Sequence, residues 1–198
     1  MKKIYPGNLL ISTPNILSDY YFKRSIILIT EINDKEVMGL IINKPLDYNL
    51  ADIDSSVNDK KIKVFSGGPV NQDNLFFIHD EQEIIKNSRF CYDNLYFGGD
   101  YEKLIEMINN KEFDWKNKVK FFSGYSGWTL EQLNEEIKEG SWIIDNKKNI
   151  NVFENNVKYF WKNKIKKSDS EFKIWLNAPT ILRIIKLIPK PFLNQQYD

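Results

Sequence analysis

Short apolar runs bounded by turn-forming residues fill roughly the first eighty positions of the chain. They are rich in β-branched and aromatic residues and too short for typical helices. These runs cover residues 9–11, 25–30, 37–42, 62–65 and 75–78. The Asn33-Asp34 pair between the second and third runs predicts a hairpin turn. The first half of the chain is therefore expected to form a β-sheet.

Helical patterns appear in the second half. Residues 101–108 carry apolar side chains at helical spacing, and Asp100 before them is a favourable N-cap. A second helix is predicted to begin at Thr129, because Thr129 and Gln132 have the spacing of a capping box. Gly140 is the expected end of that helix.

The remaining elements complete an α+β pattern. A strand is expected over residues 141–144, a third helix over 153–165 and a last short helix over 181–188. Strands followed by helices are typical of the α+β class. Because no repeat or linker interrupts the sequence, we expect a single domain over 1–198, with 47–61 as its most mobile loop.

Composition excludes several kinds of protein. The 28 Lys and Arg residues nearly balance the 27 Asp and Glu residues, so no strong overall field favours nucleic acid or an anionic membrane. Cys91 and His79 are the only residues of their types, which excludes an intramolecular disulfide and the usual zinc site but leaves a carboxylate-bound metal open. No apolar run approaches the ~20 residues of a membrane span, and the first ten residues do not resemble a signal peptide. We expect a cytoplasmic protein without a cofactor.

Two glycine clusters stand out, Gly67-Gly68-Pro69-Val70 and Gly124-Tyr125-Ser126-Gly127-Trp128. Backbone N–H groups of glycine-rich turns can cradle an anion. Neither cluster has the spacing of a P-loop or of a Rossmann motif. Close backbone packing or positive φ angles are therefore the favoured explanation of these glycines.

Ser126 and His79 raise the possibility of a nucleophile and its base. The sequence around Ser126 lacks the Gly-x-Ser-x-Gly spacing, and His79 precedes the serine instead of following it. A different triad order stays open, because triads are defined by geometry. We favour a structural role for His79 at a strand end and a packing role for Cys91.

The C-terminal part of the chain is basic, with 11 Lys or Arg and 4 Asp or Glu between residues 146 and 198. Lysines surround Tyr159, Phe160 and Trp161 there, a mix that resembles surfaces that bind single-stranded nucleic acid. The aromatic residues also have the spacing of a helix core, so an amphipathic helix with solvated lysines is the favoured interpretation. The nucleic-acid candidates are Lys158, Lys162, Lys164, Lys166 and Lys167.

Three sequence blocks together resemble the YqgE/AlgH family of bacterial proteins. The blocks run from Gly7 to Pro45, from Gly67 to His79 and from Gly124 to Trp142, so the resemblance covers about residues 7–145. It implies a compact domain with a mixed, mostly antiparallel sheet, partly closed into a small barrel and flanked by helices. Family members are often labelled transcriptional regulators, and no catalytic residues carry over from them.

These observations favour a non-catalytic regulatory protein that binds a small anionic ligand or a protein partner. Polar residues of the blocks would form one surface or pocket, because they lie at strand ends of a rigid scaffold. The alternatives are direct nucleic-acid binding through residues 146–198 and, with less support, a hydrolase that uses His79. The candidate binding residues are Arg24, Asn43, Gly67, Gly68, Pro69, His79, Gly124, Tyr125, Gly127 and Trp128.

Overall fold

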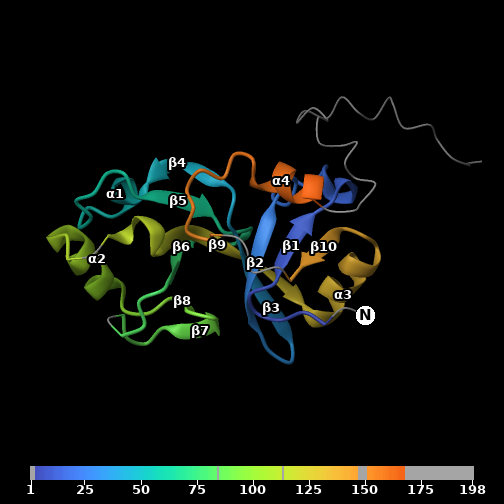
Figure 1. Cartoon of the computed structure of the whole chain (residues 1–198), viewed down its shortest axis with the longest axis horizontal. Coiled ribbons are helices and arrows are strands. Elements are labelled where there is room, and N and C mark those ends of the chain that lie inside the picture. Colours follow the sequence, from blue (N-terminus) through green and yellow to red (C-terminus); the bar gives the residue numbers. More distant parts are fainter. Residues whose placement is uncertain (1–2, 84, 113, 147–150, 168–198) are drawn as a thin grey trace, which may run out of the picture.

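The computed structural model describes residues 3–83, 85–112, 114–146 and 151–167, and one extended β-sheet runs through these segments (Figure 1). Its strands are β1 (Leu9–Ser12), β2 (Ile26–Ile32), β3 (Glu36–Ile41), β4 (Pro45–Asn49), β5 (Lys63–Ser66), β6 (Val70–His79), β7 (Arg89–Tyr92), β8 (Leu95–Phe97), β9 (Val119–Thr129) and β10 (Trp142–Asp145). The helices are α1 (Leu50–Ile53), α2 (Tyr101–Asn110), α3 (Leu130–Lys138) and α4 (Phe160–Lys167). Short 3-10 turns cover Pro14–Ile16 and Trp115–Asn117.

The sheet has the strand order β10-β1-β2-β3-β9-β6-β8-β7, and β5 joins it beside β9 with β4 at its outer edge. Only the β5–β9 pairing is parallel among the described strands. The predicted α+β class and the mostly antiparallel sheet are therefore confirmed. Within the described residues, β10 and β7 lie at opposite ends of the strand order and do not pair with each other. The expected partial closure therefore stops short of a closed barrel. The single domain predicted over 1–198 includes residues outside the described ranges and stays a prediction.

The five strands expected in the first half are present as β1, β2, β3, β5 and β6. The short hairpin of β7 and β8 was not predicted. The segment 47–61, which we expected to be the most mobile loop, is in part regular structure. It contains the end of β4 and all of α1, whose first residue Leu50 is fully buried.

The helices α2 and α3 begin where their caps predict. The side chain of Asp100 accepts the backbone N–H of Lys103, and the side chain of Thr129 accepts that of Gln132. The third helix begins at Phe160 and not near residue 153. Side chains in the preceding segment bond to nearby backbone N–H groups, as when Asn151 accepts from Phe153, and such bonds compete with a helix. The helix predicted over 181–188 lies outside the described residues.

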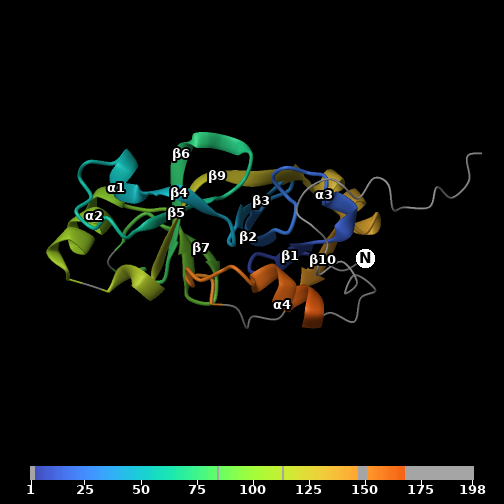
Figure 2. The same ribbon diagram turned by 90° about the horizontal axis from the view of Figure 1, so that it is seen from above.

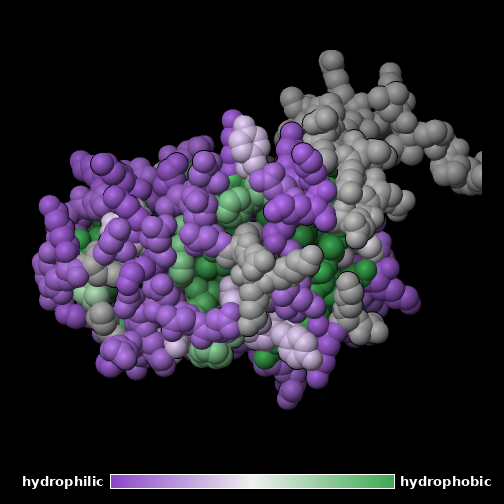
Figure 3. Space-filling model, in the orientation of Figure 1, coloured by the Kyte–Doolittle hydropathy of each residue, from purple (hydrophilic) through white to green (hydrophobic). Residues whose placement is uncertain are grey.

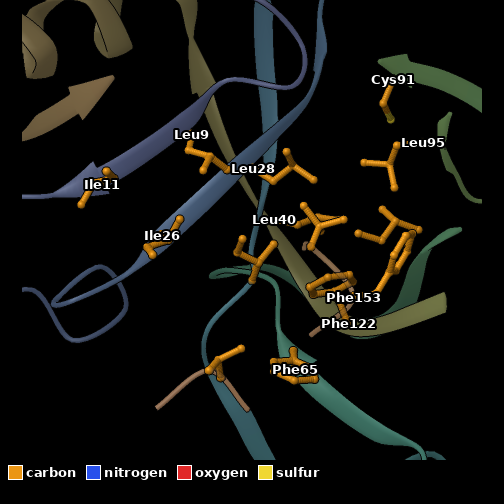
Figure 4. Packing of buried hydrophobic residues seen from close by; sticks show 14 of the residues in the cluster. Leu9, Ile11, Ile26, Leu28, Leu40, Phe65, Cys91, Leu95, Phe122 and Phe153 are labelled. Atoms are coloured by element: carbon orange, nitrogen blue, oxygen red, sulfur yellow. The ribbon is translucent and has the colours of Figure 1, made fainter. Parts of the chain in front are cut away.

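The two faces of β1 and β2 pack against different helices. Ile11 and Leu28 share one hydrophobic cluster with Trp161 and Ile165 of α4, and Figure 4 shows the strand residues of that cluster gathered together. Side chains that alternate with these, such as Ile27, pack with Leu133 of α3 instead. Figure 2 accordingly shows α3 and α4 on opposite sides of β1 and β10.

The other end of the sheet is covered by α2, whose Leu104 and Ile108 pack against Val64 and Phe121. Hydrophilic side chains cover most of the face seen in Figure 3. None of the helices in the described ranges has the length and apolar character needed to cross a bilayer.

Candidate functional site

A large open pocket, here called the cationic pocket, lies between the turn before β2, the start of β4 and the C-terminal segment that leads into α4. Its volume is about 1070 Å³. Five of its lining side chains are cationic, and no Asp or Glu occurs among the described residues that line it. The lining residues are Tyr20, Tyr21, Lys23, Arg24, Asn43, Lys44, Pro45, Leu46, Tyr48, Ser66, Gln72, Ser123, Asn155, Asn156, Val157, Lys158, Trp161 and Lys162.

Arg24 has a left-handed backbone conformation in this pocket, with φ of 54°. Such a conformation costs a non-glycine residue about 1 kcal/mol or more. Asn43 holds it in place, because its Nδ2 donates to the Arg24 carbonyl at 2.9 Å and its Oδ1 accepts from the Ile26 N–H at 2.7 Å. The Arg24 guanidinium lies 5.5 Å from the centre of the Trp161 ring. The structure therefore brings Arg24 and Asn43 together, with Asn43 positioning the turn.

Lys44 is half-buried in the same pocket and donates a hydrogen bond to the Tyr21 carbonyl. The pKa of Lys44 is lowered to about 8, mainly by burial and next by the positive charge of Lys23, whereas Asp19 opposes the shift. Charge repulsion between lysines that share a pocket has this sign. An anion bound between them would relieve the repulsion.

The C-terminal wall of the pocket is anchored to the sheet. Trp161 is 3% exposed, and its Nε1 donates to the Ser12 carbonyl at 2.8 Å. The Nζ of Lys164 lies 2.6 Å from an Asp145 carboxylate oxygen. Of the five candidate lysines, Lys158 and Lys162 line the pocket, Lys164 forms this ion pair, and Lys166 and Lys167 are exposed at the end of α4.

Lys120 was missed by the sequence analysis, although it is only 2% exposed. Its Nζ donates to the carbonyls of Ile42 at 2.9 Å and Glu154 at 2.8 Å, and it lies 3.8 Å from the centre of the Phe65 ring. Burial lowers the pKa of Lys120 to about 7. This side chain therefore connects the sheet to the C-terminal wall. A single lysine within the apolar run 119–122 was the available signal.

The two glycine clusters pack against each other at a site here called the glycine crossing, made of Gly67, Gly68, Gly124 and Ser126. A Cβ on Gly67 would lie 2.1 Å from the Gly124 carbonyl oxygen, and one on Gly68 would lie 2.3 Å from the Ser126 Oγ. The Ser126 hydroxyl donates to the Gly67 carbonyl at 3.0 Å. Close backbone packing thus explains these glycines, while Pro69 beside them is exposed.

His79 is fully buried at the end of β6. Its Nε2 lies 3.0 Å from the Gly98 carbonyl, and its Nδ1 accepts the Glu81 N–H at 3.1 Å, so these partners define a neutral imidazole with both nitrogens engaged. Burial also lowers the pKa of His79. Ser126 lies seven positions along β9 from Val119, the residue opposite His79. At about 3.3 Å per residue the separation is roughly 20 Å, which is too far for a nucleophile and its base.

Tyr125, Gly127 and Trp128 line a different and smaller pocket of about 390 Å³, which also contains Arg89. The Trp128 indole N–H donates to a Glu136 carboxylate oxygen at 3.0 Å, and the Trp142 indole N–H donates to the same oxygen at 2.7 Å. The candidate binding residues that were expected on one surface or in one pocket are therefore separated. Arg24 and Asn43 share the cationic pocket, whereas Tyr125 lines the smaller pocket and His79 is buried.

Metal ligands and thiol chemistry find little support in the described part of the chain. No three His, Cys, Asp or Glu side chains gather there in a way that could hold a metal ion. Cys91 is buried in the core, and burial raises the pKa of its thiol to about 12. The thiol is therefore protonated at neutral pH, as a packing residue would be.

Relatives with similar sequences cover nearly the whole chain. A UPF0301 protein of Chlorobium limicola is 31% identical over 179 residues, which cover 90% of this chain and 95% of that protein. A UPF0301 protein of Bacteroides fragilis is 37% identical over 176 residues, which cover 88% of each chain.

Solved structures share the fold. A crystal structure of a protein from Corynebacterium diphtheriae has a TM-score of 0.68 at 19% identity and covers 88% of this chain and 92% of that chain. The solution structure of the AlgH protein from Pseudomonas aeruginosa has a TM-score of 0.59 at 23% identity, with 74% and 82% covered. The model of the AlgH-like family matches residues 9–173, which is most of the sequence. The resemblance carried by the three sequence blocks is thereby confirmed, and the chain belongs to the AlgH-like family.

Proposed function

We propose that this chain is a non-catalytic, cytoplasmic regulatory protein that binds a small phosphate-bearing anion in the cationic pocket. The observation that carries the proposal is the gathering of five cationic side chains around one pocket without a lining carboxylate among the described residues. The whole chain has a formal charge of only +1, so the pocket is more positive than the chain as a whole. A role in transcriptional regulation, which the family resemblance implies, would be exerted through this ligand.

The cationic side chains differ in what they can offer an anion. Arg24 is held by its backbone and by Trp161, so its guanidinium is positioned before a ligand arrives. Lys44 carries a lowered pKa that an anion would restore. Lys158 and Lys162 add charge from the C-terminal wall. This combination of one guanidinium fork and several ammonium groups suits phosphate oxygens.

Direct nucleic-acid binding through residues 146–198 is the second candidate. The observation that favours it is the exposure of Lys166 and Lys167 at the end of α4, next to the pocket lysines. The ion pair of Lys164 with Asp145 removes one of the five candidate lysines from such a surface. The remaining basic residues of this part lie outside the described ranges.

The test is calorimetric titration of the full chain with inorganic pyrophosphate at low ionic strength. The double variant Lys158→Glu with Lys162→Glu reverses two charges in the pocket wall. We expect it to lose at least about tenfold in affinity, because each pair of close charges contributes on the order of 1 kcal/mol near a surface. The matched control is Lys166→Glu with Lys167→Glu, which makes the same charge change at the end of α4, outside the pocket.

Three outcomes would contradict the proposal. The first is the absence of binding heat when the wild-type protein is titrated with pyrophosphate. The second is an equal loss of affinity in both double variants, which would indicate a general charge effect. The third is tight binding of a single-stranded oligonucleotide that is abolished only in the control variant. That outcome would favour the nucleic-acid candidate.

A further inference from the structure

We propose that the anion bound in the cationic pocket is a nucleotide, with its base against the ring of Tyr20 and its phosphates among Lys44, Arg24 and the wall lysines. The inference rests on the proposed function, because it names the ligand class for the same pocket. Three features of the pocket carry it: its size, the aromatic side chain at its rim and the polar groups of its wall.

The size of the pocket exceeds what a simple anion requires. Its volume of about 1070 Å³ lies just above the ~300–1,000 Å³ usual for small-molecule sites. A bare phosphate or carboxylate would occupy only a small part of that space and would contact few of the five cations. A ligand with both an anionic end and a flat organic part fits the volume better.

The aromatic rim is formed by Tyr20, which is 75% exposed and is the most exposed of the large hydrophobic side chains in the described residues. Its ring contacts the edge of Tyr21, with 5.2 Å between centroids, and the Lys23 ammonium lies 5.3 Å from its centre. The turn that carries it is ordered, because the Asp19 carboxylate accepts the backbone N–H groups of Tyr21 and Phe22, each at 2.7 Å. These bonds hold the backbone of the turn, and the exposed ring is available for stacking.

Two of the charged groups, Arg24 and Lys44, are less exposed than this ring. Arg24 and Lys44 are half-buried, and the Arg24 guanidinium faces Trp161, which is nearly inaccessible to solvent. An aromatic rim above a cationic interior matches the two halves of a nucleotide. Aromatic rings bind bases of every type through their π-faces, and lysine and arginine bind phosphates.

The wall supplies groups that suit the edge of a base. Asn155 and Asn156 line the pocket beside Lys158. A carboxamide offers both a donor and an acceptor, which is what the edge of a purine or pyrimidine presents in return. The backbone of this wall is fixed by Lys120, which donates to the Glu154 carbonyl next to Asn155. The wall is therefore suited to reading a base as well as to enclosing it.

The experiment compares pyrophosphate with ADP by calorimetry on the full chain at pH 7.5. The measured quantity is the ratio of the two dissociation constants, which reports the contribution of the nucleoside. We expect ADP to bind at least about tenfold more tightly than pyrophosphate, and we expect Tyr20→Ala to bring the ratio close to one, since a stacked base contributes about this much. Tyr5→Ala is the matched control, because Tyr5 is also exposed and also has a lysine, Lys3, 5.5 Å from its ring centre.

The outcomes separate this inference from the proposed function. Equal affinities for pyrophosphate and ADP would overturn the nucleotide inference but would leave the proposed anion binding in place. Failure of both ligands to bind would overturn the proposed function. If ADP still bound much more tightly than pyrophosphate in the Tyr20→Ala variant, the placement of the base against Tyr20 would be wrong. Oligoadenylate that binds more tightly than ADP would overturn the inference in favour of an extended nucleic-acid site.

Discussion

The glycine crossing and the cationic pocket are neighbouring regions with opposite character. At the crossing, the polar groups bond to one another and the backbones approach so closely that a Cβ on Gly67 would lie 2.1 Å from the Gly124 carbonyl oxygen. In the pocket, several like charges surround a space of about 1070 Å³. The crossing is a structural junction that excludes ligands, whereas the pocket has charge that no lining carboxylate balances among the described residues.

The contrast separates the conspicuous sequence motifs from the residues that line the pocket. The glycine clusters are easy to see in the sequence, but their conspicuous residues are required by backbone packing. The pocket is built from lysines, tyrosines and asparagines that are common in this composition. Substitutions at the crossing should therefore change stability, and substitutions in the pocket should change binding.

The largest effect is expected from Gly67→Ala. The added methyl would overlap the Gly124 carbonyl, which is backbone and cannot move aside without separating β9 from the β5–β6 connection. We expect a loss of more than about 4 kcal/mol in the free energy of unfolding, or failure to fold. The measurement is thermal and chemical unfolding followed by circular dichroism.

Gly98→Ala is the control for this substitution. Gly98 has a φ of +66°, but no atom lies within 4 Å of where its Cβ would be. The expected cost is therefore the conformational strain alone, about 1 kcal/mol. Similar losses in the two variants would show that steric exclusion at the crossing is not what makes Gly67 necessary.

The second prediction concerns Lys120, the buried cation beneath the pocket wall. Its pKa is about 7 in the folded protein, against 10.5 for an ordinary lysine. Between these values the unfolded chain binds more protons at this side chain than the folded chain, so stability from this group rises with pH. The stability of wild type relative to Lys120→Met should rise by about 2 kcal/mol from pH 7 to pH 9.

The readout is the difference between the two proteins in chemical unfolding at several pH values, because groups that titrate in both then cancel. Lys120→Met also removes hydrogen bonds to two carbonyls, so the variant's stability at any single pH is less informative than the trend. A difference that stays constant from pH 7 to pH 9 would mean that Lys120 keeps an ordinary pKa despite its burial.

Sequence patterns predicted the fold better than the site. Strands such as β2 and β3 and the capped helices α2 and α3 follow from local periodicity and from side chains that bond to the nearest backbone. The start of α4 was placed too early, because Phe153 and Val157 are buried from an irregular segment and their spacing imitates a helix. Burial alone produced the pattern that we interpreted as helical.

The site depends on contacts that no local pattern records. Arg24 and Asn43 were named as candidates, but their meeting with Lys158 and Lys162 requires α4 to pack on β1 through Trp161. His79 was expected beside Arg24 because both belong to the family blocks. In the folded chain its two ring nitrogens bond to backbone groups, so its place in a block reflects a structural need.

The smallest expected effect is a pH dependence of binding that distinguishes Lys44 from the other pocket cations. Its pKa is about 8 in the free protein, lowered by burial and by the charge of Lys23. A bound anion stabilises the charged form and raises this pKa, so binding takes up protons near pH 8. Pyrophosphate affinity should therefore fall a few-fold between pH 7 and pH 9 beyond any change due to the ligand's own ionisation.

Lys44→Arg isolates this contribution, because a guanidinium stays charged throughout the range. The ionisation of pyrophosphate and of Lys120 affects both proteins and cancels when their affinities are compared at each pH. We expect the ratio of wild-type to variant affinity to decline through pH 8, and proton uptake measured in two buffers to be smaller for the variant. A constant ratio would place the anion away from Lys44, toward the wall formed by Lys158 and Lys162. The pocket would then contain two separate cationic regions, with the one around Lys44 serving the packing of the turn before β2.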